Sequence, residues 1–347
     1  MPTVPFGLQL PNFTLNVPDD SLFDEFVAFA VTAEESGFDS VWVMDHLYQL
    51  PALGGPSQPM LEAYTLLSAL GARTNRVKLG TLVTGVTYRN PALLAKIVTT
   101  LDIVTSGRAM LGIGAAWYDV EHEGLGFEFP AVGERMDRLE EAVKICRAMF
   151  REDRPSFEGK HYQINEAWNV PRPVQAGGPQ IMIGGGGERR TLKLVAQHAD
   201  MCNITGNVDQ IRHKVDVLHR HCKDVGRDPE EVLVTRLSTL ALTSSPSETA
   251  QTNEFLRDVA GDAVGAFNVG EENEIASQLD ELQGAGVQYF IFNMPTSGVD
   301  AVRRAGELLS KHLSKWRQSA HSNSTVRSGK TSTSATRAGF ERDDEHA

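Results

Sequence analysis

The chain lacks long apolar runs and an excess of positive charge. No uninterrupted apolar stretch reaches the roughly 18 residues needed to span a bilayer, so we expect no transmembrane helix. Lys and Arg number 33 against 45 Asp and Glu, which gives a formal net charge of −12. Because nucleic acids and anionic membranes are bound through clustered cations, this balance argues against both as main partners. A small-molecule partner is the better expectation.

Cysteine is also scarce. Cys146, Cys202 and Cys222 are widely spaced and form no CxxC pair. An odd, scattered set of this kind supports neither a disulfide framework nor a zinc ribbon. The amino-terminal segment has no basic stretch followed by an apolar one, which a secretory signal would show. We therefore expect a cytoplasmic protein with reduced cysteines.

A further absence concerns the fingerprint GxGxxG, which does not follow the first predicted strand, as a dinucleotide-binding open sheet would require. What the chain does show is an alternation of short apolar strands with amphipathic helical stretches. Predicted strands cover 6–10, 40–44, 77–83, 109–113, 180–183, 201–204, 232–242 and 287–293. Predicted helices cover 20–36, 61–73, 91–105, 133–150, 188–198, 208–225 and 299–316. Such a rhythm in a chain of this size favours an α/β fold of the (β/α)8 TIM-barrel type with insertions.

The domain organisation follows from the same pattern. We expect one barrel domain over residues 1–316, lengthened by insertions near 151–179 and 243–274. Long loops of a barrel commonly build its pocket, so we expect these insertions to shape the substrate site. From residue 317 to 347 the sequence is rich in Ser and Thr and nearly free of apolar residues. This composition predicts a disordered tail.

The strongest functional signal is Asp45-His46, which closes the apolar run 38–44. In a barrel, the carboxyl ends of the strands carry the catalytic loops. His46 is suited to general acid or base catalysis because imidazole titrates near neutrality. Asp45 could orient a bound ring or tune nearby charge. A single histidine at a strand end is, however, often a structural residue.

Two other strand ends break into small residues. Gly112 and Gly114, followed by two alanines and Trp117, leave room for a ring or a phosphate beside the backbone. The indole of Trp117 could form a flat wall. Gly184 to Gly187, ahead of Glu188-Arg189-Arg190, offers free N–H groups and cations at a helix start, as phosphate binding requires. A plain flexible turn is the alternative.

A metal site has little support. His213, His219, His221 and Cys222 share one predicted helix. Their spacing puts only His219 and Cys222 on one face, and no carboxylate completes a ligand set. We therefore expect no metal.

These segments together resemble the luciferase-like monooxygenase superfamily, in particular its actinobacterial branch of oxidoreductases that use the deazaflavin coenzyme F420. The resemblance runs from about Phe6 to Leu313. It is carried by the segments 33–46 (AEESGFDSVWVMDH), 73–81 (RTNRVKLGT), 89–91 (RNP), 107–108 with 112–117 (GIGAAW), and 183–185 with 199–200.

The resemblance implies a barrel that is commonly a homodimer and that holds the cofactor ring at its carboxyl-terminal mouth. Asp45 and His46 match a pair that contacts the ring and serves catalysis in deazaflavin sugar-phosphate dehydrogenases. Leu82-Val83 matches a non-proline cis peptide behind the ring. Residues 114–117 and 184–189 match the segments that hold the ring edge and the phosphate arm.

The chain also departs from the sugar-phosphate dehydrogenases. They carry a catalytic Glu where this chain has Trp117, and a Trp near the position of Leu50. The resemblance therefore leaves the substrate open.

The leading hypothesis is an F420-dependent oxidoreductase that transfers hydride between the deazaflavin and a small organic substrate. Its runner-up is an FMN-dependent monooxygenase that uses reduced flavin and oxygen, and a third hypothesis is a non-catalytic carrier of a flavin-like ligand. The predicted catalytic residue is His46. The predicted cofactor-binding residues are Asp45, Leu82, Val83, Gly114, Ala115, Ala116, Trp117, Gly184, Gly185, Gly186, Gly187, Glu188 and Arg189.

Overall fold

The computed structural model describes residues 4–324 except for 16, 261–266 and 295–296. Eight parallel strands close into a barrel, which confirms the predicted (β/α)8 architecture. Closure comes from β1, which pairs on one side with β2 and on the other with β11. The barrel strands are β1 (Phe6–Leu10), β2 (Ser40–Asp45), β3 (Lys78–Gly85), β4 (Ala109–Gly114), β7 (Gln180–Gly184), β8 (Met201–Ile204), β9 (Leu233–Leu242) and β11 (Tyr289–Asn293).

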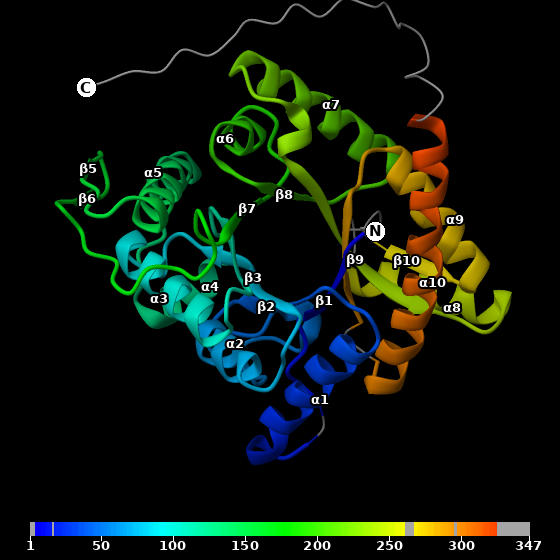
Figure 1. The fold of residues 1–347 in the computed structure, drawn as a ribbon. Coiled ribbons are helices and arrows are strands. Elements are labelled where there is room, and N and C mark those ends of the chain that lie inside the picture. Colours follow the sequence, from blue (N-terminus) through cyan, green and yellow to red (C-terminus); the bar gives the residue numbers. More distant parts are fainter. Residues whose placement is uncertain (1–3, 16, 261–266, 295–296, 325–347) are drawn as a thin grey trace, which may run out of the picture.

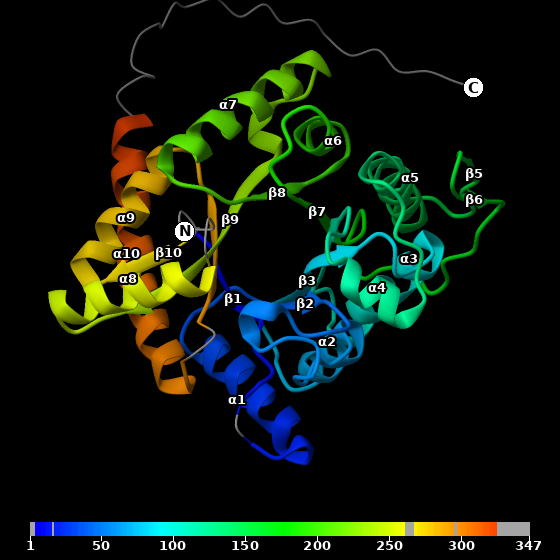
Figure 2. The same ribbon diagram turned by 180° about the vertical axis from the view of Figure 1, so that it is seen from behind.

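Helices form a ring outside the strands, as Figure 1 and the reverse view in Figure 2 show. The ring comprises α1 (Leu22–Glu35), α2 (Ala63–Gly71), α3 (Pro91–Val104), α5 (Val132–Arg151), α6 (Thr191–His198), α7 (Val208–Asp224), α9 (Glu272–Gly284) and α10 (Val299–Ser324). The sequence prediction did not separate α9, because this helix begins within the expected second insertion. Gly37 and Gly107 end helical segments with φ of 92° and 88°, a conformation that glycine adopts without steric cost.

Apolar side chains pack on both sides of the barrel wall. Alternate strand residues such as Val41 and Val43 join the large core between strands and helices. Trp42, between them, points the other way and fills the barrel interior with Met110 and Met182. The indole fits because Gly7 and Gly80 on the flanking strands have no side chains, which would collide with it. The interior is therefore packed below the mouth, as in other barrels of this kind.

The first insertion, 151–179, joins α5 to β7 and carries the hairpin of β5 (Phe157–Glu158) and β6 (Gln163–Ile164). Gln175 in this segment donates from its side chain to Asp102 and to the carbonyl of Ala109, the first residue of β4. The segment therefore runs past the amino ends of the strands, and the hairpin lies at the outer edge of the molecule (Figures 1 and 2). The expectation that this insertion shapes the mouth of the barrel is wrong, because an α-to-β connection returns the chain to the opposite end.

The second insertion, 243–274, follows the carboxyl end of β9. It contains α8 (Pro246–Ala260) and β10 (Phe267–Gly270), which pairs with the last four residues of β9. Its residues 261–266 lie outside the described residues. At the end of the chain, α10 continues to Ser324, past the predicted start of the tail at 317, and the rest of that tail is not described. Among the described helices, none is both long and apolar enough to cross a membrane.

Gly112 provides a test of the close approach between β3 and β4. A Cβ at this position would lie 2.0 Å from the carbonyl oxygen of Thr81. Gly112→Ala should therefore force the two strands apart and lower the free energy of unfolding by about 1 to 3 kcal/mol. The midpoint of urea denaturation measures this loss.

Gly133→Ala is the matched control, because a Cβ at Gly133 in α5 meets nothing within 4 Å. Alanine should leave stability unchanged or raise it by up to about 1 kcal/mol. Equal midpoints for the two variants would contradict the packing argument.

Candidate active site

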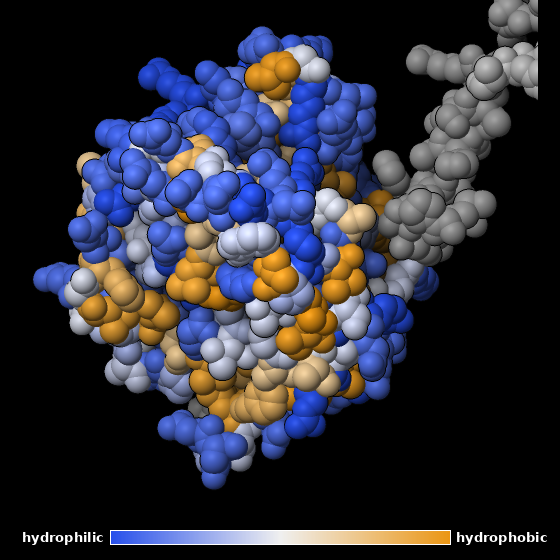
Figure 3. All heavy atoms as spheres, turned by 60° about the vertical axis from the view of Figure 1, so that its left-hand side comes forward, coloured by the Kyte–Doolittle hydropathy of each residue, from blue (hydrophilic) through white to orange (hydrophobic). Residues whose placement is uncertain are grey.

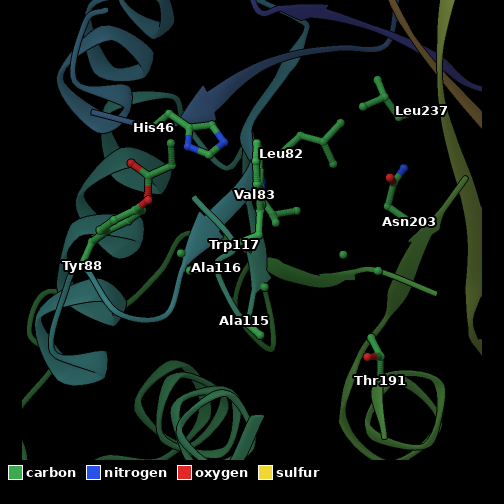
Figure 4. A pocket seen from close by; sticks show the side chains of 15 residues that line it. His46, Leu82, Val83, Tyr88, Ala115, Ala116, Trp117, Thr191, Asn203 and Leu237 are labelled. Carbon is green, nitrogen blue, oxygen red and sulfur yellow. The ribbon is translucent and has the colours of Figure 1, made fainter. Parts of the chain in front are cut away.

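A cavity of about 370 Å³ opens at the carboxyl ends of the barrel strands. In Figure 4, His46 and Tyr88 lie on one side, Asn203 and Leu237 on the other, and Leu82 between them. The cavity is lined by Asp45, His46, Leu82, Val83, Gly85, Tyr88, Gly114, Ala115, Ala116, Trp117, Gly184, Gly185, Thr191, Asn203 and Leu237. Six barrel strands or the loops that follow them contribute to it, as expected for the catalytic end of a barrel.

Most of the predicted site residues meet in this cavity, although they come from four distant segments. Asp45, His46, Leu82, Val83, Gly114 to Trp117, Gly184 and Gly185 all line it. The remaining four, Gly186, Gly187, Glu188 and Arg189, are not in its lining. Glu188 and Arg189 instead border a separate surface depression beside α7.

His46 is held by a buried carboxylate that sequence reasoning missed. Its Nδ1 lies 2.8 Å from Oε1 of Glu121, whose side chain is 0% exposed. The other carboxylate oxygen of Glu121 accepts hydrogen bonds from the backbone N–H groups of Leu47 (2.6 Å) and Tyr48 (3.1 Å). The Tyr88 hydroxyl also donates to Glu121. This one carboxylate thereby fixes the imidazole and the loop that follows it.

The charge state of Glu121 decides the tautomer of His46. Burial alone would raise the pKa of Glu121, but hydrogen bonds from His46, Tyr88 and the Leu47 amide lower it overall. The ionised carboxylate accepts only, so a neutral imidazole carries its proton on Nδ1. Nε2 is then left with a lone pair. With a side chain that is 15% exposed, His46 lines the cavity.

No sequence pattern identified Glu121. It lies in the short helix α4 (Asp119–Leu125), where acidic residues in the first turn are common on protein surfaces. Only the packing of α4 against the loop after β2 turns this side chain inward.

Asp45 is tied to a cation rather than free in the cavity. Its two oxygens accept from Nη1 (2.6 Å) and Nη2 (3.0 Å) of Arg89, and the guanidinium also bonds Glu62 at 2.5 Å. The guanidinium lies over the ring of Tyr64, 4.9 Å from its centroid. Burial raises the pKa of Asp45 to about 6, and Arg89 opposes that rise. The bidentate pair therefore keeps Asp45 ionised at neutral pH.

The wall between the two sides of the cavity is formed by a bulged part of β3. The Leu82–Val83 peptide bond is cis, as the resemblance implies. The register between β3 and β4 shifts across this stretch. A Cβ at Gly114 or Gly184 would come within 2.8 or 2.9 Å of the Val83 methyl groups. Glycine at both positions therefore allows Val83 to sit between β4 and β7 and leaves their backbones open to a ligand.

Cations gather beyond the glycine run rather than inside the cavity. The ammonium of Lys214 lies so close to Gly186 that a side chain there would collide with it. Arg189, Arg190 and Lys193 border a surface depression beside the start of α6. This arrangement offers charge and backbone N–H groups to an anionic arm that leaves the cavity past Gly185.

Two of the α7 histidines, His213 and His221, contact Glu188. His213 Nε2 lies 3.0 Å from a carboxylate oxygen of Glu188, and His221 Nε2 lies 2.8 Å from the Glu188 carbonyl oxygen. Cys222 is buried. Among the described residues, no three His, Cys, Asp or Glu side chains converge as a metal site would require.

Comparisons with known sequences place the chain among redox enzymes. The family described as luciferase-like monooxygenase matches residues 4–260. The F420-dependent glucose-6-phosphate dehydrogenase of Kineococcus radiotolerans is 30% identical over 281 residues, 79% of this chain and 81% of that protein. The enzyme of the same name from Nocardia farcinica is 32% identical over 305 residues, 78% of this chain and 88% of that protein.

Solved structures share the fold at lower identity. An F420-dependent secondary alcohol dehydrogenase, in complex with an F420-acetone adduct, superposes with a TM-score of 0.73 at 20% identity, covering 90% of this chain and 99% of that one. The long-chain alkane monooxygenase LadA reaches a TM-score of 0.77 at 15% identity, covering 91% and 92%. F420 enzymes and monooxygenases therefore share this barrel, and the fold alone does not separate them.

The Asp45–Arg89 pair makes a prediction about stability. Their side chains are 0% and 12% exposed, so Arg89→Met would leave a buried carboxylate without its cation. Removing one partner of a buried pair commonly costs about 3 to 5 kcal/mol, and we expect a loss of about 3 kcal/mol. Thermal and chemical denaturation measure it.

Arg190→Met is the matched control, because the Arg190–Asp137 pair is 44% and 41% exposed. Its loss should cost less than about 1 kcal/mol. The double variant Asp45→Asn/Arg89→Met should regain part of the stability that Arg89→Met loses. Equal losses from the two arginine variants would argue against the buried pair as a stabilising contact.

Proposed function

The chain belongs to the luciferase-like monooxygenase family, and from that premise we propose that it is a coenzyme F420-dependent oxidoreductase. The reaction is hydride transfer between the deazaflavin and a small organic substrate, and His46 moves the accompanying proton. The observation that carries the proposal is the similarity to F420-dependent dehydrogenases over about four fifths of the chain (79%). That similarity supports F420 over the FMN alternative and an enzyme over a non-catalytic carrier.

The shape of the cavity fits such a cofactor. The glycines at 114 and 184 leave backbone exposed beside Val83, which suits a flat ring. The glycine run and Lys214 beyond the cavity suit the phosphate-bearing arm of the coenzyme. When bound, the deazaflavin accepts or supplies the hydride, a chemistry that no protein side chain provides.

The protein's own part in the reaction is proton transfer and orientation. Glu121 holds the Nδ1 side of His46, so Nε2 is the atom available to take a proton from a substrate hydroxyl or to return one. Asp45, fixed by Arg89, supports the loop from which His46 projects and places a negative charge behind it. His46 is the catalytic residue of this proposal, and Asp45 and Glu121 are positioning residues.

The remaining expectations are part of the same proposal. We infer a cytoplasmic location, because all three cysteines are free and buried, which suits a reducing environment. A homodimer follows from the resemblance to the superfamily. The disordered tail remains a prediction from composition.

The proposal is tested by titrating the purified protein with oxidised F420 and, separately, with FMN, and following cofactor absorbance. We expect micromolar or tighter binding of F420 and at least tenfold weaker binding of FMN, a difference of about 1.4 kcal/mol. Preference for FMN together with substrate-dependent oxygen consumption would replace the proposal by the monooxygenase alternative. If the protein bound neither F420 nor FMN, both the F420-dependent proposal and the monooxygenase alternative would be wrong.

His46→Gln should lower the turnover number by about 10² to 10⁴, because glutamine cannot exchange a proton near neutral pH. The dissociation constant of F420 should change less than about threefold. Reduction of F420 by the best alcohol from a panel containing 2-propanol, cyclohexanol and glucose 6-phosphate supplies the rate. A turnover number close to that of the unmodified enzyme would remove His46 from the mechanism.

Glu121→Gln is the companion variant, because it keeps the imidazole and removes the charge that fixes its tautomer. We expect a smaller loss, about 10 to 100 fold, together with a changed pH profile of the rate. If the rate fell without a change in the pH profile, Glu121 would be a purely structural residue.

A further inference from the structure

Negative and positive charges lie at opposite ends of the cavity, with carboxylates at the His46 end and cations beyond the glycine run. Among the described residues that line it, the ionisable side chains are Asp45, His46 and Tyr88, and there is no Lys or Arg. The guanidinium of Arg89 is already shared by Asp45 and Glu62. That of Arg135 donates to the carbonyl of the lining residue Ala115 and lies over the ring of Phe129. The internal stretches that the structure does not describe, at 16, 261–266 and 295–296, contain no Lys or Arg in the sequence.

The cations sit instead beyond the glycine run, where Lys214 lies against Gly186 and where Arg189 and Lys193 border the depression at α6. That end suits the anionic arm of the cofactor. The His46 end has the buried carboxylates of Asp45 and Glu121 behind it. A phosphate at the His46 end would lose its hydration without gaining a cationic partner, which is strongly unfavourable.

A large apolar side chain, that of Trp117, lies beside His46. The ring of Trp117 stands edge-on to the imidazole, with 5.5 Å between the ring centroids, and is 61% exposed. Trp117 follows Ala116, whose φ of 61° is rare for a residue with a side chain and turns the chain at this point. Apolar side chains continue outward along and beyond α4, with exposed fractions of 39 to 63%: Val120, Leu125, Phe127 and Val132.

Leu82 and Leu237 supply apolar surface inside the cavity (Figure 4). Apolar groups are also visible among hydrophilic ones on the face that Figure 3 turns forward. An indole cannot accept a hydrogen bond from a sugar hydroxyl, but it offers a large flat surface to hydrocarbon or aromatic groups.

We propose that the substrate is an uncharged alcohol, or the corresponding ketone, with an apolar carbon skeleton that packs on Trp117. This inference rests on the proposed F420-dependent function. In the oxidation direction, the carbinol C–H bond breaks and its hydrogen leaves with the electron pair as hydride to oxidised coenzyme F420. The O–H bond breaks and its proton goes to Nε2 of His46, so that the C–O bond becomes a carbonyl. Reduction of the ketone reverses each transfer.

Binding to the F420-loaded protein tests the substrate class without relying on turnover. The probes are 4-phenylbutan-2-one and glucose 6-phosphate. The ketone has no carbinol C–H bond, so oxidised F420 cannot take a hydride from that carbon. Isothermal titration calorimetry should give saturable binding of the ketone and at least tenfold weaker binding of glucose 6-phosphate. Trp117→Ala should weaken ketone binding about tenfold, because a large aromatic contact is lost.

Trp168→Ala is the matched control, since Trp168 is 66% exposed, stacks with Arg154, and lies in the segment at the opposite end of the barrel. The Trp168→Ala variant should bind the ketone as tightly as the unmodified protein does. Trp117→Phe should retain most of the affinity that Trp117→Ala loses. F420 affinity is measured in every variant.

The outcomes separate the two proposals. Failure of the unmodified protein to bind F420 would overturn the proposed function and this inference with it. If F420 binds while glucose 6-phosphate binds as tightly as the ketone, the F420 assignment stands and the apolar substrate class is wrong. Ketone binding that is unaffected by Trp117→Ala would likewise overturn the role of Trp117.

Discussion

The buried carboxylate of Glu121 is the contact on which the site depends. It joins the loop after β2, the loop after β3 and helix α4 through hydrogen bonds from Leu47, Tyr48, Tyr88 and His46. A buried carboxylate is stable only where donors surround it, and here every such donor belongs to a loop at the mouth of the barrel. The same interactions that satisfy the charge therefore hold the imidazole at one orientation and in one tautomer.

A second buried carboxylate, that of Asp45, is neutralised in a different way. It takes its partner from the loop just before α3, where Arg89 bridges it to Glu62. This pairing commits the guanidinium of Arg89 to two carboxylates rather than to a ligand. Structural stabilisation and ligand selection are thus coupled, because the cation that stabilises Asp45 is no longer available to an anionic substrate. The apolar face of Trp117 then dominates what a substrate meets.

Much of this organisation was predictable from the sequence, because it depends on local patterns. The alternation of apolar strands with amphipathic helices predicted the barrel. The ends of β2, β3, β4 and β7 meet at one cavity, since parallel barrel strands bring their carboxyl ends to one mouth. Helix α9 was missed because its sequence adjoins an irregular insertion. The first insertion was assigned to the wrong end because its length suggested a pocket loop, although its place between the predicted helix 133–150 and the predicted strand 180–183 makes it an α-to-β connection.

Periodicity and short-range motifs in the amino-acid sequence are enough to predict the barrel, the family and the residues at the strand ends. The partners of those residues depend on the folded arrangement. Glu121 lies 75 positions from His46, and Arg89 lies 44 positions from Asp45. No local pattern encodes pairings at such separations, since they arise when barrel closure brings distant loops together. The electrostatic character of the cavity is a property of those pairings, and it therefore emerges only in the folded protein.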